Sequence, residues 1–350
     1  MLMMKRRSSV LIIALLLLLV GSSIYIYKSK SRLTTVDEDS RNFRFKDTAS
    51  VTRIFIADKE GNQASIERTK KGWVVNGKYV CRSEAILNLL EVVRNVEVKA
   101  PVPKETKENV IKFLASGALK VEIYCGDNLV KQYYVGHETL DSEASYMLLR
   151  DIESNKNYAD PYACFIPGFN GYLRPRYIAK ENEWRDRLVL NYIPPQLKQI
   201  KVVHASTSQD SSFTIDILNT TTFKLKNLAG REVNFDLDKM KQYLIYFQNL
   251  SYEGLITGKN KRLQDSLNLS QPFCTISIKT VEEKTEVFKF YRKQFAGNIN
   301  PEIGVKYDFD PDRLYLNFGN GKEWALIQYF VFGKLLVNTG YLLPNGSVKK

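Results

Sequence analysis

Short runs in which apolar and polar side chains alternate fill most of the chain after residue 50. The run that begins at Val51 alternates between two faces, and a polar turn over 58–62 leads into a second alternating run, 64–68. Alternation with a period of two is typical of a strand with one buried face. Asn76-Gly77 then provides a strong signal for a tight hairpin turn. The pattern therefore predicts an antiparallel meander at the start of the body.

One run with a helical period follows the meander. Ser83 can cap it, and the apolar residues after Ser83 recur at i, i+3, i+4 and i+7, which predicts an amphipathic helix. These residues are Ile86, Leu89, Leu90 and Val93. More alternating runs come next, among them 121–125 and 130–135. A meander, a helix and further strands with few long crossovers predict antiparallel sheets with helices on one face, the α+β class.

The same order of elements returns after Pro195. Alternating runs at 197–203 and 213–217 take the places of the first two strands, and a helix that Asp236 or Asp238 can cap follows them. Its apolar residues repeat the helical spacing: Met240, Tyr243, Leu244 and Phe247. The offset between the halves grows from about 146 to about 154 residues, as expected where loops absorb changes of length. We therefore expect two similar units; the alternative is two unrelated mixed folds that share a generic order of elements.

The predicted boundaries place the first unit at 44–187 and the second at 188–343. The first range ends with a stretch from Phe169 to Trp184 that carries several charges and Pro175, and that we interpret as a connection. A polar tail over 344–350 ends the chain.

A long apolar run from Val10 to Tyr27 sets the N-terminal segment apart. Eighteen helical residues extend about 27 Å, close to the roughly 30 Å thickness of a bilayer's hydrocarbon core. The run therefore predicts a transmembrane helix over 10–27, after a cytoplasmic tail over 1–9 and before a stalk over 28–43. A cleaved signal peptide is the alternative, but no A-x-A-like site is present and Ile24 continues the apolar run.

The expected location of the body follows from this segment. A short basic tail before a long domain favours an N-in orientation, because long domains translocate largely regardless of their charge. We therefore expect a single-pass protein of the inner (cytoplasmic) membrane, with its body in the periplasm or outside. The membrane is then one partner, and nucleic acid is not expected as another. The net charge of +13 suits anionic lipids or acidic glycans, although lysines scattered over solvated faces are the preferred explanation.

Four cysteines, Cys81, Cys125, Cys164 and Cys274, are widely spaced and form no CxxC pair. Four cysteines allow three disulfide pairings, and the sequence does not choose between them. Cys125 and Cys274 lie within apolar strand patterns. We expect mostly buried free thiols.

Residues with catalytic or metal-binding chemistry are sparse. His137 and His204 have no second ligand at zinc spacing. Asp308, Asp310 and Asp312 form a D-x-D-x-D string that resembles a calcium loop, but the Gly and Glu that such a loop requires further on are missing. Glycine-rich phosphate loops and the G-x-S-x-G and H-E-x-x-H strings do not occur in the sequence. We expect no enzyme activity, no metal and no cofactor.

Trp184, Arg185 and Asp186 stand where the two predicted units meet. They are candidates for a ligand cleft between the repeats, since clefts are frequent at such boundaries. The structural alternative, which we prefer, is that Trp184 packs into the joint while Arg185 and Asp186 pair.

Several segments resemble the bacterial DUF4340 domain proteins, particularly their Bacteroidetes branch. The segments that carry the resemblance are Asp47–Asp58, Gly72–Tyr79, Pro101–Lys104, Glu108–Lys112 and Trp184–Asp186. The resemblance implies a membrane-anchored protein with an extracytoplasmic repeat body. Because some members accompany ABC-type transporter and gliding-like gene sets, it also implies an accessory of envelope transport or assembly. The family's function is itself unassigned, so no catalytic residues carry over.

Three functional hypotheses remain. The preferred one is a non-catalytic accessory that binds another protein or complex of the cell envelope. The second is a module that binds cell-wall or surface glycans, because the chain is basic and contains 20 Tyr and 18 Phe. The third is a hydrolase that uses paired carboxylates, which composition alone leaves open.

Overall fold

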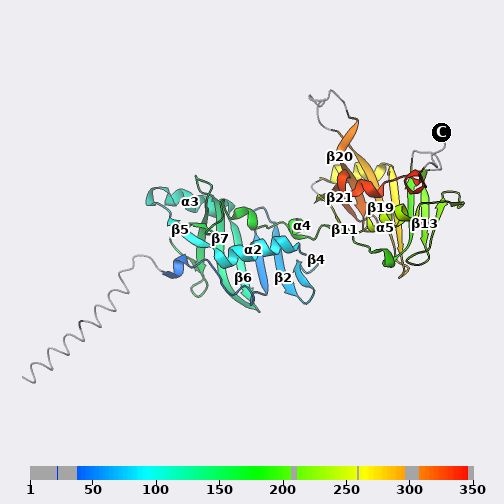
Figure 1. The fold of residues 1–350 in the computed structure, drawn as a ribbon. Helices are drawn as coiled ribbons and strands as arrows, with labels where there is room; N and C mark the ends of the chain where they lie inside the picture. Colours follow the sequence, from blue (N-terminus) through cyan, green and yellow to red (C-terminus); the bar gives the residue numbers. More distant parts are fainter. Residues whose placement is uncertain (1–21, 23–37, 206–210, 258–259, 296–306, 346–350) are drawn as a thin grey trace, which may run out of the picture. The chain divides into compact units, whose positions relative to one another are not determined.

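The computed structural model describes residue 22 and residues 38–205, 211–257, 260–295 and 307–345. The chain divides into two compact units, Met1–Asp186 and Arg187–Lys350. Both are drawn in Figure 1. This boundary lies one residue before the predicted one.

The first unit is built on a 10-stranded antiparallel sheet. It starts with the meander β1 (Arg53–Ala57), β2 (Gln63–Thr69), β3 (Gly72–Val75) and β4 (Tyr79–Val80). The later strands are β5 (Glu97–Pro101), β6 (Leu119–Cys125), β7 (Asn128–Glu138), β8 (Ser145–Asp151), β9 (Lys156–Asn157) and β10 (Tyr162–Phe165). The strand order is β4-β3-β2-β1-β6-β7-β8-β10-β5, and β9 pairs with β8. The sheet therefore joins the meander to the later strands through β1 and β6.

Two helices cover opposite faces of this sheet. Helix α2 (Ser83–Asn95) crosses one face (Figure 1) and packs in the main core, to which β8 contributes Met147 and Leu149. Helix α3 (Lys104–Gly117) packs against Leu148, whose side chain points to the other face. The prediction of helices on one face only was wrong, because α3 buries few residues and its sequence carries a weak signal.

The second unit repeats this plan with a 9-stranded sheet. Its strands are β12 (Leu197–His204), β13 (Phe213–Ile217), β14 (Phe223–Asn227), β15 (Glu232–Val233), β17 (Gly254–Leu255), β18 (Cys274–Thr280), β19 (Thr285–Gln294), β20 (Phe309–Phe318) and β21 (Glu323–Gln328). The order β15-β14-β13-β12-β18-β19-β20-β21-β17 matches that of the first sheet strand by strand. Helices α5 (Leu237–Ile245) and α6 (Lys261–Leu269) again pack in separate clusters, and β11 (Leu188–Leu190) pairs with β16 (Leu250–Ser251).

The register of strand pairing is also the same in both sheets. One row of directly paired residues crosses the middle of each meander and continues into the next strand. In the first unit this row is Ile66, Ile54 and Ile123, and in the second it is Ile215, Ile200 and Ile278. Equivalent positions can therefore be assigned across the two units from backbone pairing alone.

Each unit ends with a short helical segment that packs into its own core. In the first, η2 (Arg174–Arg176) and α4 (Glu181–Trp184) fill this role, and in the second α7 (Tyr329–Phe332), η6 (Gly333–Leu335) and α8 (Thr339–Leu342) do. The carbonyl of Trp184 accepts a 2.8 Å hydrogen bond from the backbone N–H of Arg82, and that of Leu342 accepts one of 2.8 Å from Asp236. The stretch 169–184 is thus the last part of the first unit, and its interpretation as a connection was wrong.

The first unit also begins earlier than predicted. Phe43 lies fully in its core, and the Ser40 hydroxyl shares a 3.1 Å hydrogen bond with that of Tyr162. Residues 38–41 form η1 (Glu38–Arg41), so 38–43 belong to the unit rather than to a stalk. Residues 28–37 of the predicted stalk lie outside the described residues.

The predicted fold class, an α+β body behind a transmembrane helix, needs correction. Of the described residues, 40% are in strands and 25% in helices, and the strands form three sheets. Strands predominate because tight turns rather than helices join most successive strands. None of the helices described is long and apolar enough to span a bilayer. The longest of them, α3, has 14 residues and extends about 21 Å, against the roughly 30 Å required.

The membrane assignments depended on segment 10–27, which lies outside the described residues except for Ser22. The predicted tail 1–9 and residues 346–350 lie outside them as well. Because none of the described helices could span a bilayer, the predicted transmembrane anchor and the predicted inner-membrane location with a periplasmic body are corrected and not retained.

Candidate functional site

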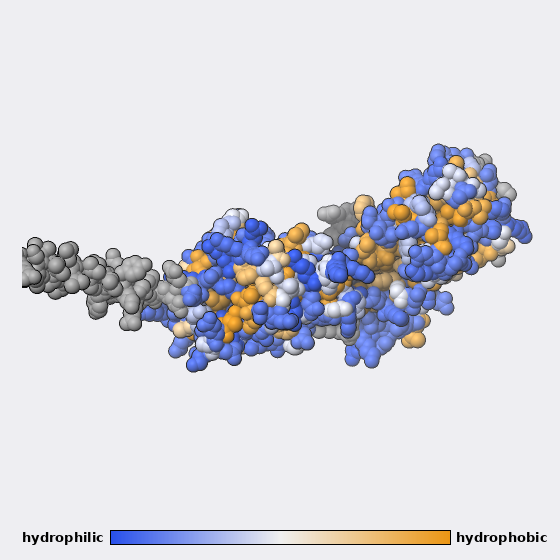
Figure 2. Space-filling model, turned by 90° about the horizontal axis from the view of Figure 1, so that it is seen from below, coloured by the Kyte–Doolittle hydropathy of each residue, from blue (hydrophilic) through white to orange (hydrophobic). Residues whose placement is uncertain are grey.

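A mainly apolar groove of about 470 Å³ opens on the second unit. It is lined by the short 3-10 turn η3 (Pro194–Gln196), the end of β13, the start of β14, helix α5 and the turn between β18 and β19. Its walls include Leu197, Ile217, Phe223 and Leu244. On the face drawn in Figure 2, hydrophobic patches likewise interrupt a mostly hydrophilic surface.

Three aliphatic side chains on the walls of this groove are half exposed. Leu218 is 58% exposed, Ile245 55% and Val281 56%. Single exposed apolar residues are common on protein surfaces, but three exposed apolar residues in one groove are typical of a binding surface. Their concentration in one hollow indicates a surface that a second molecule can cover.

Backbone hydrogen bonds hold the walls of the groove in place. The N–H of Val281 donates to the carbonyl of Gln196 (2.9 Å), which joins the β18–β19 turn to η3. At the other wall, Asn219 Oδ1 accepts hydrogen bonds from the backbone N–H groups of Thr221 and Thr222, at 2.9 and 2.8 Å. The exposed Leu218 and Val281 therefore sit on ordered turns.

Lysine side chains fix the turn that carries Val281. Glu283 in this turn accepts hydrogen bonds from Lys198 and Lys279, and the second ion pair measures 2.5 Å. These bonds lower the pKa of Glu283 to about 2. The turn is thus held by charge pairs next to the groove, while the groove itself stays apolar.

An arginine occupies the equivalent position in the first unit. Backbone pairing aligns Arg68 and Trp73 of the first unit with Ile217 and Phe223 of the second. The Arg68 guanidinium lies 4.8 Å from the centre of the Trp73 ring and donates to the carbonyl of Thr48 (2.9 Å). In the second unit an isoleucine replaces the arginine, and Ile217 and Phe223 line the apolar groove without a charged group at this position.

Helices α2 and α5 also differ in charge at an equivalent position. Matching the buried residues of α2 and α5 aligns Glu91 with Ile245. Glu91 pairs with Arg176 at 2.5 Å, whereas Ile245 is half exposed in the groove. Two charged positions of the first unit are therefore apolar in the second, where the groove is open.

The chemistry of the groove suits binding. The described residues that line it are aliphatic, aromatic, proline, amide and hydroxyl side chains with one lysine, Lys241, on helix α5. None of them is a carboxylate, an imidazole or a thiol. Lys241 and Thr220 are of types that can transfer protons or act as nucleophiles, but among the described residues no carboxylate or imidazole lines the groove with them to activate either one. This arrangement can hold an apolar ligand with an acidic group near Lys241.

The predicted cleft residues Trp184, Arg185 and Asp186 all make contacts within the first unit. Trp184 is fully buried, and its Nε1–H donates to the carbonyl of Ile178 (2.8 Å). The Arg185 guanidinium lies 3.7 Å from the centre of the Tyr79 ring. The backbone N–H of Asp186 donates to Val80 (2.7 Å). Their role in a cleft between the repeats stays a prediction.

The two histidines are far from any ligand cluster. His137 lies edge-on to the ring of Phe113, and His204 Nε2 is 3.1 Å from the carbonyl of Val337. Within the part of the chain that the structure describes, no three His, Cys, Asp or Glu side chains are grouped to hold a metal ion.

The D-x-D-x-D string has a structural role at the start of β20. Asp310 pairs with Lys293 at 2.5 Å and accepts hydrogen bonds from the backbone N–H groups of Asp312 and Arg313. These bonds and the nearby lysine lower the pKa of Asp310 although burial opposes the shift. Its carboxylate therefore stays ionised and is occupied by the protein itself.

All four cysteines are free, and three of them, Cys81, Cys164 and Cys274, are buried. Burial raises the pKa of Cys81 and of Cys274 to about 12 and raises that of Cys164 well above its ordinary value. Thiols in such surroundings are poor nucleophiles. Cys125 is partly exposed, and its Sγ lies 3.3 Å from the Ser50 hydroxyl.

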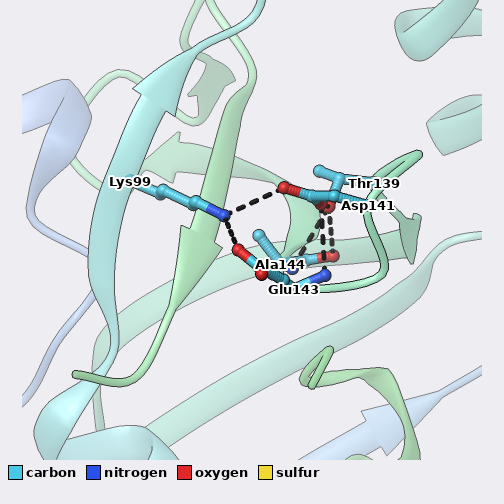
Figure 3. A network of polar contacts seen from close by, with 5 residues as sticks. All are labelled: Lys99, Thr139, Asp141, Glu143 and Ala144. Atoms are coloured by element: carbon cyan, nitrogen blue, oxygen red, sulfur yellow. Dashed lines mark hydrogen bonds and ion pairs between the residues drawn. The ribbon is translucent and has the colours of Figure 1, made fainter. Parts of the chain in front are cut away.

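Carboxylates brace turns in the first unit. Figure 3 shows Lys99 of β5 reaching Asp141 (3.0 Å) and Glu143 (2.5 Å) in the β7–β8 connection, where the Thr139 hydroxyl also bonds to Asp141. The hydrogen bond from Thr139, followed by that from Lys99, lowers the pKa of Asp141.

Across the described residues, no Asp or Glu is buried, and each carboxyl with a shifted pKa is shifted downward. A raised carboxyl pKa, as a general acid requires, is not found among them.

Sequence reasoning missed the groove. The available signal was weak: Leu218 and Val281 are apolar residues in turns, where polar residues are usual. Comparison of the chain with protein-family models, curated proteins and solved structures found no match. The resemblance to DUF4340 proteins stays a prediction from the segments quoted above.

Proposed function

We propose that this chain is a non-catalytic binding protein whose second unit holds a short apolar segment of a protein partner. The observation that carries the proposal is the apolar groove around Ile217 and Phe223, at the position where Arg68 stacks on Trp73 in the first unit. The two copies of the fold differ here in charge and not in backbone pairing. The charged side chains of the first unit are replaced by apolar ones at these positions of the second unit, as expected for a surface that a ligand covers.

The shape and polarity of the groove define the occupant. A volume of about 470 Å³ accommodates a few aliphatic or aromatic side chains, and ordered walls limit the entropy lost on binding. Lys241 favours an acidic residue beside the apolar ones. Covering each half-exposed side chain, such as Leu218, Ile245 or Val281, contributes about 1 kcal/mol, roughly half the value for a fully exposed one. The partner segment is thus a short apolar peptide with an acidic flank.

The test is a peptide-display selection on the full chain, followed by fluorescence-anisotropy titration of one enriched peptide. We expect enriched peptides to combine apolar residues with an Asp or Glu. Ile245→Glu restores the charge of the first unit at a half-exposed site, and we expect it to weaken binding about tenfold or more, which corresponds to about 1.4 kcal/mol. Ile217→Arg, which restores the arginine of the first unit, should act in the same direction.

Leu87→Glu is the matched control, because Leu87 is an exposed apolar residue of α2 in the first unit. It changes surface charge without touching the groove, and we expect unchanged affinity. No enrichment of apolar peptides, or equal affinity of Ile245→Glu and the unmodified chain, would refute the proposal.

The hydrolase hypothesis receives less support. The downward pKa shifts of the described carboxyls argue against the paired-carboxylate hydrolase. An accessory role, as the DUF4340 resemblance implies, agrees with the proposal but adds no residue to the site.

A further inference from the structure

A second hollow on the same unit is rich in aromatic rings. It has a volume of about 470 Å³ and lies between the start of β18, the end of β19, the start of β20 and helix α7. Phe273, Tyr307, Phe309 and Tyr329 line it together with Arg292. Phe309 is 41% exposed and Tyr329 48%, so much of both rings faces water.

Contacts within the protein hold these rings in place. The Arg292 guanidinium carbon lies 5.0 Å from the centre of the Phe273 ring and 5.1 Å from that of Phe309, within cation–π range of both. Tyr329 rests against the backbone of Gly333, where an added Cβ would come within 2.9 Å of the ring. The absence of a side chain at Gly333 thus allows this position of Tyr329. The ring surface is organised before any ligand arrives.

The polar groups of the hollow include a donor and an acceptor. Arg292 has N–H donors, and the exposed Asp308 has carboxylate acceptors. Asp310 also lines the hollow, but Lys293 pairs with it and neutralises its charge. The hollow therefore offers ring faces, donors and acceptors without a strong excess of either charge.

From this combination we infer that the hollow is a binding site for an uncharged saccharide. A pyranose ring has a face of C–H groups, which packs on aromatic rings, and a rim of hydroxyls, which both donate and accept hydrogen bonds. Phe309 and Tyr329 supply ring faces, while Arg292 and Asp308 supply the polar partners. For an anionic ligand, attraction by Arg292 would be offset by repulsion from Asp308. A wholly apolar ligand would cover Arg292 and Asp308 without giving either a hydrogen-bond partner.

The first unit does not repeat the residues of this hollow at the equivalent positions. Strand register aligns Phe273 with Ala118 and Arg292 with His137. The β7–β8 connection there is a short turn braced by Lys99 (Figure 3), whereas β19 and β20 are joined by a longer connection after Gln294. The aromatic lining is thus not repeated at the aligned positions of the first unit, and its residues are not those of the apolar groove.

Saturation-transfer NMR on the full chain tests this inference with three probes: cellotriose, maltotriose and triacetylchitotriose. We expect transfer to the ring protons of at least one of them. Tyr329→Ala and Phe309→Ala should weaken that binding about tenfold, while Tyr329→Phe should retain most of it.

Phe330→Ala is the control, because Phe330 is 93% exposed, adjacent in sequence and not part of the hollow. It should bind as the unmodified chain does. Tyr329 is half exposed, so its replacement leaves the fold intact and keeps the test valid even if Phe309→Ala unfolds. Absence of transfer with all three probes, or transfer that Tyr329→Ala does not reduce, overturns the inference.

Discussion

Replacing Trp184 by alanine tests whether the stretch 169–184 is part of the first unit. The Trp184 side chain is fully buried in the core of that unit, and its Nε1–H donates to the carbonyl of Ile178. Truncation of a buried Trp costs about 3–5 kcal/mol, and the lost hydrogen bond adds about 1 kcal/mol, so we expect a loss of about 4–6 kcal/mol. A typical domain is stable by about 5–15 kcal/mol, so the first unit would be close to unfolding.

Urea unfolding followed by tryptophan fluorescence measures this loss unit by unit. Trp73 lies in the first unit and Trp324 in the second, so each transition keeps a reporter after Trp184 is removed. We expect only the transition of the first unit to shift. Leu342→Ala, at the equivalent buried position, should shift that of the second by about 2–5 kcal/mol.

Leu87→Ala is the control for the unfolding series, because this exposed residue should change stability by less than about 0.5 kcal/mol. If Trp184→Ala costs no more than about 1 kcal/mol, the stretch is a loose connection, and the reasoning from burial and hydrogen bonding is refuted.

Two further predictions concern titratable groups. The pKa of Glu283 is lowered from its ordinary 4.5 to about 2, so its lysine pairs stabilise the folded state above pH 4.5, and this contribution is lost as the pH falls towards 2. In Glu283→Gln the free energy of unfolding should therefore depend less on pH between 4.5 and 2. An unchanged acid-unfolding curve would show that the pairs do not contribute. Iodoacetamide at pH 8 should label only Cys125 in the folded chain, because the other three thiols are buried, and it should label all four cysteines in urea. Peptide mass spectrometry measures the labelling, and labelling of Cys81 in the folded chain at the rate of Cys125 would contradict this prediction.

Local signals in the sequence predicted local structure well. Asn76 and Gly77 adopt positive φ angles of 50° and 66°, as the hairpin turn requires. Three of the four residues named from the period of helix α2, Ile86, Leu89 and Val93, are buried. The predicted cap was wrong by one residue, since Ser83 is the first residue of the helix and Arg82 is its N-cap, without a side-chain hydrogen bond. Such features depend on residues close together in the chain, so a single sequence contains the information.

Features that depend on long-range packing were not predictable in the same way. Helix α3 buries only Val110 and Leu114, too few to give a clear helical period. The segment that ends at Trp184 contributes core residues at irregular spacing, so it resembled a connection. The character of the groove depends on which side chain stands beside the aromatic ring: Arg68 beside Trp73 in the first unit, and Ile217 beside Phe223 in the second. Periodicity carries no information about that contact.

Hydrogen–deuterium exchange of the full chain, with and without an enriched apolar peptide, locates the surface that the partner segment covers. We expect slower exchange on binding at the end of β13, the start of β14 and helix α5, where Ile217, Phe223 and Ile245 lie. We expect no change at the equivalent Arg68, Trp73 and Glu91 of the first unit. Protection in both units alike, or protection away from the groove, would contradict the claim that the second unit alone holds the partner segment.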